Sequence, residues 1–455
     1  MRQSAFTIMT PIDPGEVAEL ESLLNDIGDH IDDNPHVRFA ELEDLHYASF
    51  FIVANGTEGA HLFFEGNVDG RTRPFLEKLL ETEAARNAVD SIYGHCIGYP
   101  PAATDRAAAL HYLTSHDIGA NAFYVAWPGR TVGEIHREQQ LRDGIERFID
   151  EQGRALRQQR PDAIHQRIAD RVADDPGMEW ARTTPPKPFL VAHGKRVRNL
   201  ILVLVTMAVL RLVKVAFGRS STRLGRFAAR VILGSIPALA GVAVRQLRTE
   251  ERKDDRDDRE RVPDWQTRFA RWTESQDLLG IVRRENVQVQ NHMVSVTKVK
   301  DGWFRLTTLR LVLWVINLTA RLTANKGKLG GISSIHFARW VITPDKSLVF
   351  MSNFDGSWES YLNDFIDLAA AGLTAVWTNT ENEVGFPRTK WLVTKGARDE
   401  ARFKAYARFS MVPTNTWYSA YPDLTVSNME NNMRIREALF APLDPPATAA
   451  WLRRL

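Results

Sequence analysis

The chain has 455 residues, of which 44% are hydrophobic and 25% charged, and this composition excludes collagen-like, coiled-coil and wholly disordered proteins. Its single cysteine, Cys96, excludes an internal disulfide framework, and the first residues lack the apolar stretch of a secretory signal, so we expect a cytoplasmic protein. The formal net charge of +2 is a sum of unlike parts. Residues 195–248 hold eleven Lys and Arg and no Asp or Glu, which leaves −9 for the rest of the chain.

The first elements along the chain alternate strand and helix patterns. Apolar runs of strand length lead into turns, and the helical stretches between them have one apolar face. The pattern predicts, in order, a strand and turn at 6–15, a helix at 17–31, strands at 44–53 and 61–70, an amphipathic helix after Asp69-Gly70, and a strand within 121–132. The order β-α-β-β-α-β is that of a ferredoxin-like unit.

The same order returns in the last third of the chain. DLHYASFFIV matches SIHFARWVIT, HLFFEGNVDG matches SLVFMSNFDG, and NAFYVAWPGRTV matches NTWYSAYPDLTV, all in the same sequence order. The second copy predicts a strand at 294–302, a helix at 304–322, strands at 334–343 and 347–356, a helix after Asp355-Gly356, and a strand within 415–426. Matching blocks with compatible gaps indicate an internal duplication.

This arrangement resembles the dimeric α+β barrel superfamily, in which two ferredoxin-like units pack their sheets face to face. The resemblance covers about residues 5–150 and 290–440. It implies an α+β fold in which two ferredoxin-like repeats form a pseudo-dimeric barrel within one chain. We therefore expect a first repeat at 1–150, an inserted helical segment at 151–285 and a second repeat at 286–455.

The insertion differs in composition from both repeats. Residues 152–177 predict an exposed, charged helix, residues 183–188 (TTPPKP) a linker, and residues 250–265 a solvated tether or helix of balanced charge. Between them lie two apolar runs, NLILVLVTMAVL at 199–210 and VILGSIPALAGVAV at 231–244. Both are shorter than the 18 or more uncharged residues of a simple transmembrane helix.

Three readings of the segment at 189–248 stay open. The unpaired cations favour attachment to an anionic membrane surface, where Lys and Arg side chains reach the headgroups. The alternatives are a helical hairpin buried by protein, including an oligomer contact, and a pair of spanning helices. Nucleic acid is not expected as a partner, because aliphatic side chains and not aromatic platforms alternate with the charges.

Paired histidines and aspartates are the first candidates for chemistry. His46 and His336 occupy equivalent strand positions, so a barrel would bring them near a pseudo-two-fold axis, as metal or haem ligands, as acid and base, or as structural groups. Asp69 and Asp355 each precede a glycine and a helix, which is typical of a helix N-cap.

The motif GNVDG at 66–70 resembles the Gly-x-x-Asp-Gly signature of dye-decolourising peroxidases, haem enzymes of the same superfamily. The resemblance implies a distal-side role for Asp69 and haem as a cofactor. A proximal ligand from the second repeat would be His336 or His292, because no histidine follows His336 in the chain.

Further candidates come from each repeat. Tyr124 and Tyr418 match each other and are either phenol donors or core aromatics. His95-Cys96 has no counterpart in the second repeat, so Cys96 is either a nucleophile or an inert thiol. Arg339 replaces Ser49 and either clamps a carboxylate or haem propionate or forms a structural ion pair.

These features predict a protein peripheral to a membrane, with an oligomer left open. The first hypothesis is an oxidoreductase, haem-dependent and peroxidase-like, acting on a lipophilic small molecule in the barrel interior. The alternative is a non-catalytic protein on the same fold that binds a lipid or ligand or acts as a scaffold. The sequence contains no nucleotide-binding fingerprint and no high-specificity metal motif.

Overall fold

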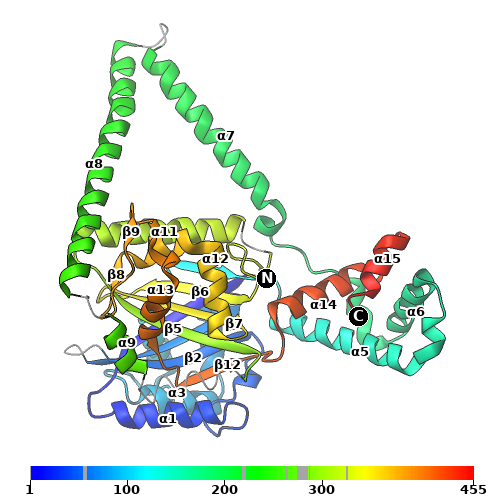
Figure 1. Cartoon of the computed structure of the whole chain (residues 1–455). Helices are drawn as coiled ribbons and strands as arrows, with labels where there is room; N and C mark the ends of the chain where they lie inside the picture. Colours follow the sequence, from blue (N-terminus) through cyan, green and yellow to red (C-terminus); the bar gives the residue numbers. More distant parts are fainter. Residues whose placement is uncertain are drawn as a thin grey trace.

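The computed structural model describes residues 2–54, 59–217, 222–261, 265–273, 285, 287–323 and 326–455. The fold is mixed α+β, with antiparallel sheets and helices on their outer faces (Figure 1). Its two halves follow the predicted element order on either side of a long helical hairpin.

Each half contributes strands, covering helices and a long helix at its end. The first half contains β1 (Gln3–Pro11), α1 (Val17–Asp29), β2 (Leu45–Ala54), β3 (Ala60–Asp69), α2 (Thr72–Leu79), α3 (Glu83–Tyr93), α4 (Arg106–Ser115), β4 (Ala122–Val125) and α5 (Val132–Arg157). The second half contains β5 (Gln290–Val299), α11 (Trp303–Leu322), β6 (Ile335–Ile342), β7 (Ser347–Asp355), α12 (Trp358–Trp377), β8 (Thr380–Glu381), β9 (Thr389–Lys390), β10 (Thr394–Lys395), α13 (Glu400–Phe409), β11 (Met411–Val412), β12 (Thr416–Ser419) and α14 (Val426–Leu439).

The two main sheets exchange one strand each. The first sheet has the order β1-β3-β2-β12 and the second β11-β5-β7-β6-β4, with β8 paired to β5. The last strand of each half therefore lies beside the second strand of the other half: Tyr418 faces Ala48, and Tyr124 faces Ala338. A self-contained ferredoxin-like unit would keep this strand in its own sheet, so the halves are interlocked and neither sheet is complete alone.

Backbone hydrogen bonds also link the two sheets at their edges. The segment before β4 bonds to β1 through Ile118 N to Thr7 O, 2.8 Å. The segment before β12 bonds to β5 of the second sheet through Val296 N to Ser410 O, 2.8 Å. Each connection thus passes from one sheet to the other with its polar backbone groups paired.

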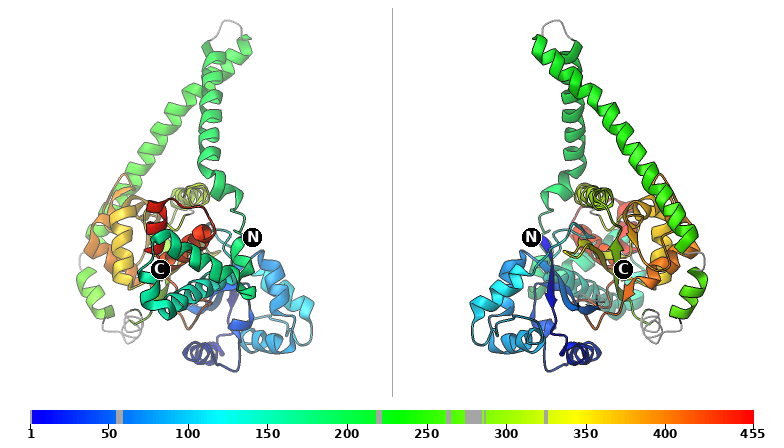
Figure 2. Two further views of the ribbon diagram at one scale, coloured as in Figure 1. Left: turned by 90° about the vertical axis from the view of Figure 1, so that its right-hand side faces the viewer. Right: turned by 90° about the vertical axis from the view of Figure 1, so that its left-hand side faces the viewer.

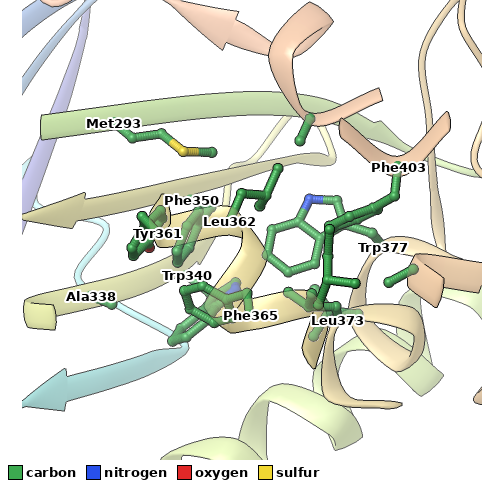
Figure 3. Close-up of a cluster of buried hydrophobic side chains, with 14 of the residues drawn as sticks. Met293, Ala338, Trp340, Phe350, Tyr361, Leu362, Phe365, Leu373, Trp377 and Phe403 are labelled. Carbon is green, nitrogen blue, oxygen red and sulfur yellow. The ribbon is translucent and has the colours of Figure 1, made fainter. Parts of the chain in front are cut away.

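Successive side chains along each strand point to opposite faces of the sheet, and this divides the core into layers. Phe50 packs outward with the helices α1 to α4, whereas its neighbour Phe51 points inward, to a cluster with Val294, Val349 and Met351 of the other sheet. On the outer face of the second sheet, α12 and α13 bury a large aromatic cluster (Figure 3). Within it Tyr361 stacks on Phe354, their ring centroids 4.0 Å apart.

A group of helices extends from the sheets on the right of Figure 1. Here α5 and α14 pack together with α6 (Pro161–Ala173) and α15 (Pro445–Leu452). The expectation of an exposed helix at 152–177 is wrong for α6, because Ile168 and Val172 are buried against this group. The expected domain boundary at residue 150 lies inside α5.

Two long helices project from the top of the body in Figure 1 as a hairpin, α7 (Phe189–Phe217) and α8 (Arg223–Arg261). Both are long and apolar enough to cross a membrane by length and composition, and only 6% of either apolar window is buried within the chain. Each apolar run is therefore part of a longer helix, and neither is covered by the rest of the described chain.

The C-terminal part of α8 returns to the body of the protein. Of the expectation of a solvated tether or helix at 250–265, the helix is confirmed as far as Arg261, but Asp254 and Asp258 are paired with the second half and not simply solvated. Asp254 lies 2.8 Å from Arg305 and 2.9 Å from Lys300, and Asp258 pairs with Arg388 and Arg402. These contacts fix the base of the hairpin to the second sheet.

Candidate functional site

The structure joins the predicted histidines and aspartates into two equivalent pairs. His46 Nε2 lies 3.1 Å from Asp69 Oδ1 in the first half, and His336 Nε2 lies 2.6 Å from Asp355 Oδ1 in the second. Both imidazoles are 1% exposed. Each pair joins the second strand of a half to the end of the third, as the matching blocks in the sequence require.

The second oxygen of each aspartate binds the first turn of a distant helix. Val132 N of α5 donates to Asp69 Oδ2 at 2.9 Å, and Val426 N of α14 donates to Asp355 Oδ2 at 2.8 Å. The interpretation of these aspartates as N-caps of the helices that follow them is wrong. Instead, each carboxylate stabilises the positive end of the helix that follows the exchanged strand.

Aromatic side chains surround the two pairs. Tyr421 Oη lies 2.8 Å from His46 Nδ1, and Tyr47 donates to Gln290 Oε1 at 3.0 Å while its ring lies 5.6 Å from that of His336. Burial raises the pKa of both phenols well above their usual value, so both stay protonated at neutral pH. His336 Nδ1 is buried without a hydrogen-bond partner among the described residues.

A separate buried ion network lies between the sheets. Arg339 Nε is 3.1 Å from Glu65 Oε2, and the guanidinium also donates to Gly66 O at 3.0 Å and to Asn67 Oδ1 at 2.6 Å. Burial alone would raise the pKa of Glu65, but the charge of Arg339, together with His292 and Ser49, lowers it to about 2. Arg339 therefore forms a structural ion pair, one of its two predicted roles.

The charged residues Glu65 and Arg339 of this network have uncharged residues at the matched positions of the other half. The aligned blocks place Met351 opposite Glu65 in the repeat, and Ser49 opposite Arg339. One half thus supplies the carboxylate and the other the cations. The difference between the copies identified Arg339, whereas we did not select Glu65, although a charged residue inside the apolar block HLFFEGNVDG is a usable signal.

His292 connects the ion network to a cavity at the surface. Its Nε2 lies 2.8 Å from Glu65 Oε1, and its Nδ1 lies 3.0 Å from Thr414 Oγ1. Thr414 is partly exposed, whereas the His292 side chain is only 2% exposed. The cavity has a volume of about 400 Å³ and is lined by these two residues together with Trp417, Gln290 and residues from α1 and its following loop.

The chain Thr414, His292 and Glu65 has the order of a hydroxyl, an imidazole and a carboxylate. With its Nε2 facing the ionised carboxylate, a neutral His292 holds its proton there and leaves Nδ1 to accept from the hydroxyl. Such an arrangement can accept a proton from the hydroxyl or from a molecule in the cavity. Sequence reasoning missed Thr414, because only the fold brings it to His292.

His46 has no free ring nitrogen for a haem iron, whereas His336 keeps Nδ1 without a partner among the described residues. Both ring nitrogens of His46 are occupied, by Asp69 and Tyr421, and His336 uses Nε2 for Asp355. The cavity beside His292, and one of about 540 Å³ at the base of α7, are lined by neither His46 nor His336. The predicted distal role of Asp69 also conflicts with its two contacts, since both of its oxygens are engaged.

His95 and Cys96 lie apart from both networks. Cys96 Sγ is 3.3 Å from Thr10 Oγ1, and burial raises the pKa of the thiol to about 11 although the Thr10 contact opposes the shift. A protonated thiol at neutral pH is the opposite of an activated nucleophile, which favours the inert alternative. His95 Nδ1 lies 2.9 Å from Glu16 Oε2, and Glu19 lies near both.

The matched tyrosines are core residues. Tyr124 is buried in the cluster on the outer face of the second sheet, and burial raises its pKa. Tyr418 stacks on Phe39, ring centroids 5.1 Å apart. Neither lies with the histidine pairs. The nearby phenols are instead Tyr47 and Tyr421, which the sequence comparison did not select although Tyr421 belongs to a repeated block.

These features define a mixed α+β protein of two similar halves with buried polar networks and a projecting hairpin. No known family model, no curated protein and no solved structure matches the chain at a significant level.

Proposed function

We propose that this protein works at a membrane surface, attached by the hairpin of α7 and α8, and that its α+β body binds a lipid or another small ligand. The single observation that carries the proposal is the exposed apolar surface of the hairpin. Leu200, Leu204 and Ile232 are each at least half exposed, as are many of their neighbours. An exposed apolar surface of this size needs a partner that removes it from water.

The charges beside the apolar runs favour a bilayer as that partner. Lys195, Arg196 and Arg198 precede the run in α7, and Arg245 and Arg248 follow the run in α8. More cations lie at the other end of both runs, and no carboxylate occurs between residues 195 and 248. Anionic headgroups pair with such cations at about 1 kcal/mol each.

The length of the apolar runs favours shallow insertion. At 1.5 Å per residue, runs of 12 and 14 residues measure about 18 and 21 Å, against about 30 Å for the hydrocarbon core. Cations at the hairpin tip would have to reach the far headgroups if the hairpin spanned. We therefore favour attachment from one side, the cytoplasmic one, over a spanning pair.

We further propose that the body is a duplicated ferredoxin-like barrel with exchanged final strands. The matching order of four strands in the two sheets, the equivalent histidine–aspartate pairs and the bonded connections between the sheets support this reading. The space between the sheets is filled by apolar side chains and the Glu65–Arg339 pair. That packing favours the cavity beside His292, and not the barrel interior, as the place for a ligand.

The packing also favours ligand binding over the peroxidase hypothesis. The haem prediction has a direct check: protein expressed with haem supply is examined for Soret absorbance, then titrated with haemin. We expect no Soret band and no saturable change. A saturating Soret shift that is lost in His336→Ala would restore the oxidoreductase hypothesis.

Flotation with vesicles of phosphatidylcholine and phosphatidylglycerol tests membrane attachment. The full chain should float, and flotation should weaken with salt because screening reduces the attraction of surface charges. The variant Leu204→Glu/Ile232→Glu places carboxylates in the two apolar runs and should remain in the soluble fraction. A matched control, Glu19→Gln/Glu21→Gln on α1, should float like the parent. Equal flotation of both variants rejects attachment through the hairpin.

A further inference from the structure

Helix α11 presents a second apolar surface on the side from which the hairpin projects. Its exposed residues include Trp303, Leu311, Trp314 and Leu318, with Trp303 74% and Trp314 59% exposed. Leu311, Trp314 and Leu318 lie on one stripe, because residues three and four apart share a helix face. Two exposed tryptophans and two exposed leucines on one helix are far more than scattered surface residues require.

The opposite face of α11 holds it to the body. Leu309 and Leu313 are fully buried in the core of the second half. The apolar stripe therefore points away from the body. In Figure 1 α11 lies across the top of the body between the bases of α7 and α8, and Figure 2 shows it end-on at the same edge.

Both legs of the hairpin are fastened to α11. Near its C-terminal end, Gly194 of α7 lies so close to the Leu322 carbonyl that a Cβ at Gly194 would come within 2.2 Å of the oxygen. Near its N-terminal end, Arg305 donates to Glu250 O at 3.2 Å and pairs with Asp254 of α8. The helix and the hairpin thus form one frame.

The exposed surface of α11 carries positively charged side chains and no carboxylate of its own. Residues 303–322 contain no Asp or Glu, and Arg310 and Arg321 are exposed, whereas Arg305 is buried and paired with Asp254 of α8. The cavity of about 540 Å³ at the base of α7 is lined by Lys187, Lys326 and Lys328 and also by Glu430 and Glu437, the last of which pairs with Lys187. Apolar side chains between cations, with tryptophans among them, are typical of a helix that lies in the interfacial layer of an anionic bilayer.

We propose that the exposed face of α11 is a second membrane-contacting surface, which lies flat in the headgroup layer at the base of the hairpin. This inference rests on the proposed attachment through the hairpin and deepens it. Three points of contact, the two legs and α11, would hold the body in one orientation against the bilayer. A hairpin alone would leave the body free to tilt.

Site-specific labelling tests the contact. In a Cys96→Ser background, single cysteines at Leu318 of α11, Val205 of the hairpin and Glu21 of α1 are labelled with an environment-sensitive dye. Vesicles of phosphatidylcholine and phosphatidylglycerol carrying a shallow spin-label quencher are then added. We expect a blue shift and quenching at Leu318→Cys and Val205→Cys, and neither at Glu21→Cys, because α1 lies at the far end of the body (Figure 1).

The outcomes separate the two proposals. Quenching at Val205→Cys without quenching at Leu318→Cys leaves hairpin attachment standing and overturns the role of α11. Absence of quenching at both positions overturns both. A blue shift at Leu318→Cys that depends on protein concentration and needs no vesicles would assign the α11 face to a second copy of the chain, and would also overturn the inference.

A second variant measures the strength of the contact. Trp303→Ser/Leu311→Ser/Trp314→Ser/Leu318→Ser removes the apolar stripe and spares the buried face, so the body should remain folded by circular dichroism. We expect vesicle partitioning to be about tenfold weaker or more, because the variant has less apolar surface to bury in the bilayer. Thr307→Ser/Thr319→Ser, on the same helix, should partition like the parent. Unchanged partitioning of the quadruple variant contradicts the inference.

Discussion

Glu65 and Arg339 form a buried ion pair, Oε2 to Nε 3.1 Å, between strands that come from different halves of the chain. Both side chains are at most 2% exposed. Because the equivalent positions hold Met351 and Ser49, the pair exists on one side of the pseudo-symmetry only. It therefore specifies how the two sheets face each other, which apolar packing alone would leave less determined.

A double-mutant cycle measures this specificity. Glu65→Met alone and Arg339→Met alone should each destabilise the protein by about 3–5 kcal/mol, since each leaves an uncompensated buried charge. The double variant Glu65→Met/Arg339→Met should recover most of that loss. Urea unfolding followed by circular dichroism supplies the free energies. Additive losses in the double variant would contradict a direct pair.

The same pair predicts a defined loss of stability in acid. The pKa of Glu65 falls from 4.5 to about 2 on folding, so the folded protein binds fewer protons than the unfolded chain between these values. The contribution, about 3 kcal/mol, is complete above pH 4.5 and is lost as the pH falls toward 2. The difference in unfolding free energy between the parent and Glu65→Gln should shrink in this window. A difference independent of pH would exclude Glu65 as the titrating group.

The element order could be predicted from periodicity, but the strand exchange could not. The expected strands at 44–53 and 61–70 correspond to β2 and β3, and the expected helix at 304–322 to α11. The strands β4 and β12 bury their first and third residues alike and differ only at the fourth, so alternation does not tell which sheet edge each one joins. Which sheet each one joins depends on the packing of the connection before it, which local patterns do not record.

Site residues could be predicted where both halves carry the same residue at a matched position, or where a charged residue in one half replaces an uncharged one in the other. Comparison of the halves selected His46 and His336, and their aspartates, because both copies carry them. It also selected Arg339 by its absence from the first copy. Thr414 could not be predicted, because its partner His292 lies more than a hundred residues away and no sequence pattern records a contact of that span, whereas Glu65 had a usable signal in its charge within an apolar block.

The histidine–aspartate pairs predict unequal sensitivity in the two halves. Asp69→Ala removes the acceptor for Val132 N and the partner of His46, and should cost about 2–3 kcal/mol because both donors stay buried. Asp355→Ala should cost about 1 kcal/mol less, since the Asp355 side chain is 12% exposed against 2% for Asp69, and water can replace it. Thermal unfolding of both variants checks the order, and equal losses would argue against burial as the cause.

The Cys96 thiol should resist alkylation in the folded protein. Its pKa of about 11 leaves very little thiolate at pH 8, and the side chain is buried. Iodoacetamide labelling followed by mass spectrometry should show slow modification of the native chain and rapid modification in urea. The control Thr10→Val removes the contact that favours the thiolate and should not speed labelling. Fast native labelling would revive the nucleophile hypothesis.

His292 should be held as one tautomer by its two contacts. In the neutral ring the carboxylate of Glu65 beside Nε2 favours the proton on that nitrogen, which leaves Nδ1 to accept from Thr414. Nitrogen-15 NMR of labelled histidine reports the tautomer directly. Thr414→Val should shift the Nδ1 resonance and cost about 1–3 kcal/mol, because a buried acceptor loses its donor. Thr414→Ser keeps the hydroxyl and should restore both readouts. An unchanged Nδ1 resonance in Thr414→Val would mean that the hydroxyl does not donate to the ring, and the proton relay to Glu65 would then lack its first member.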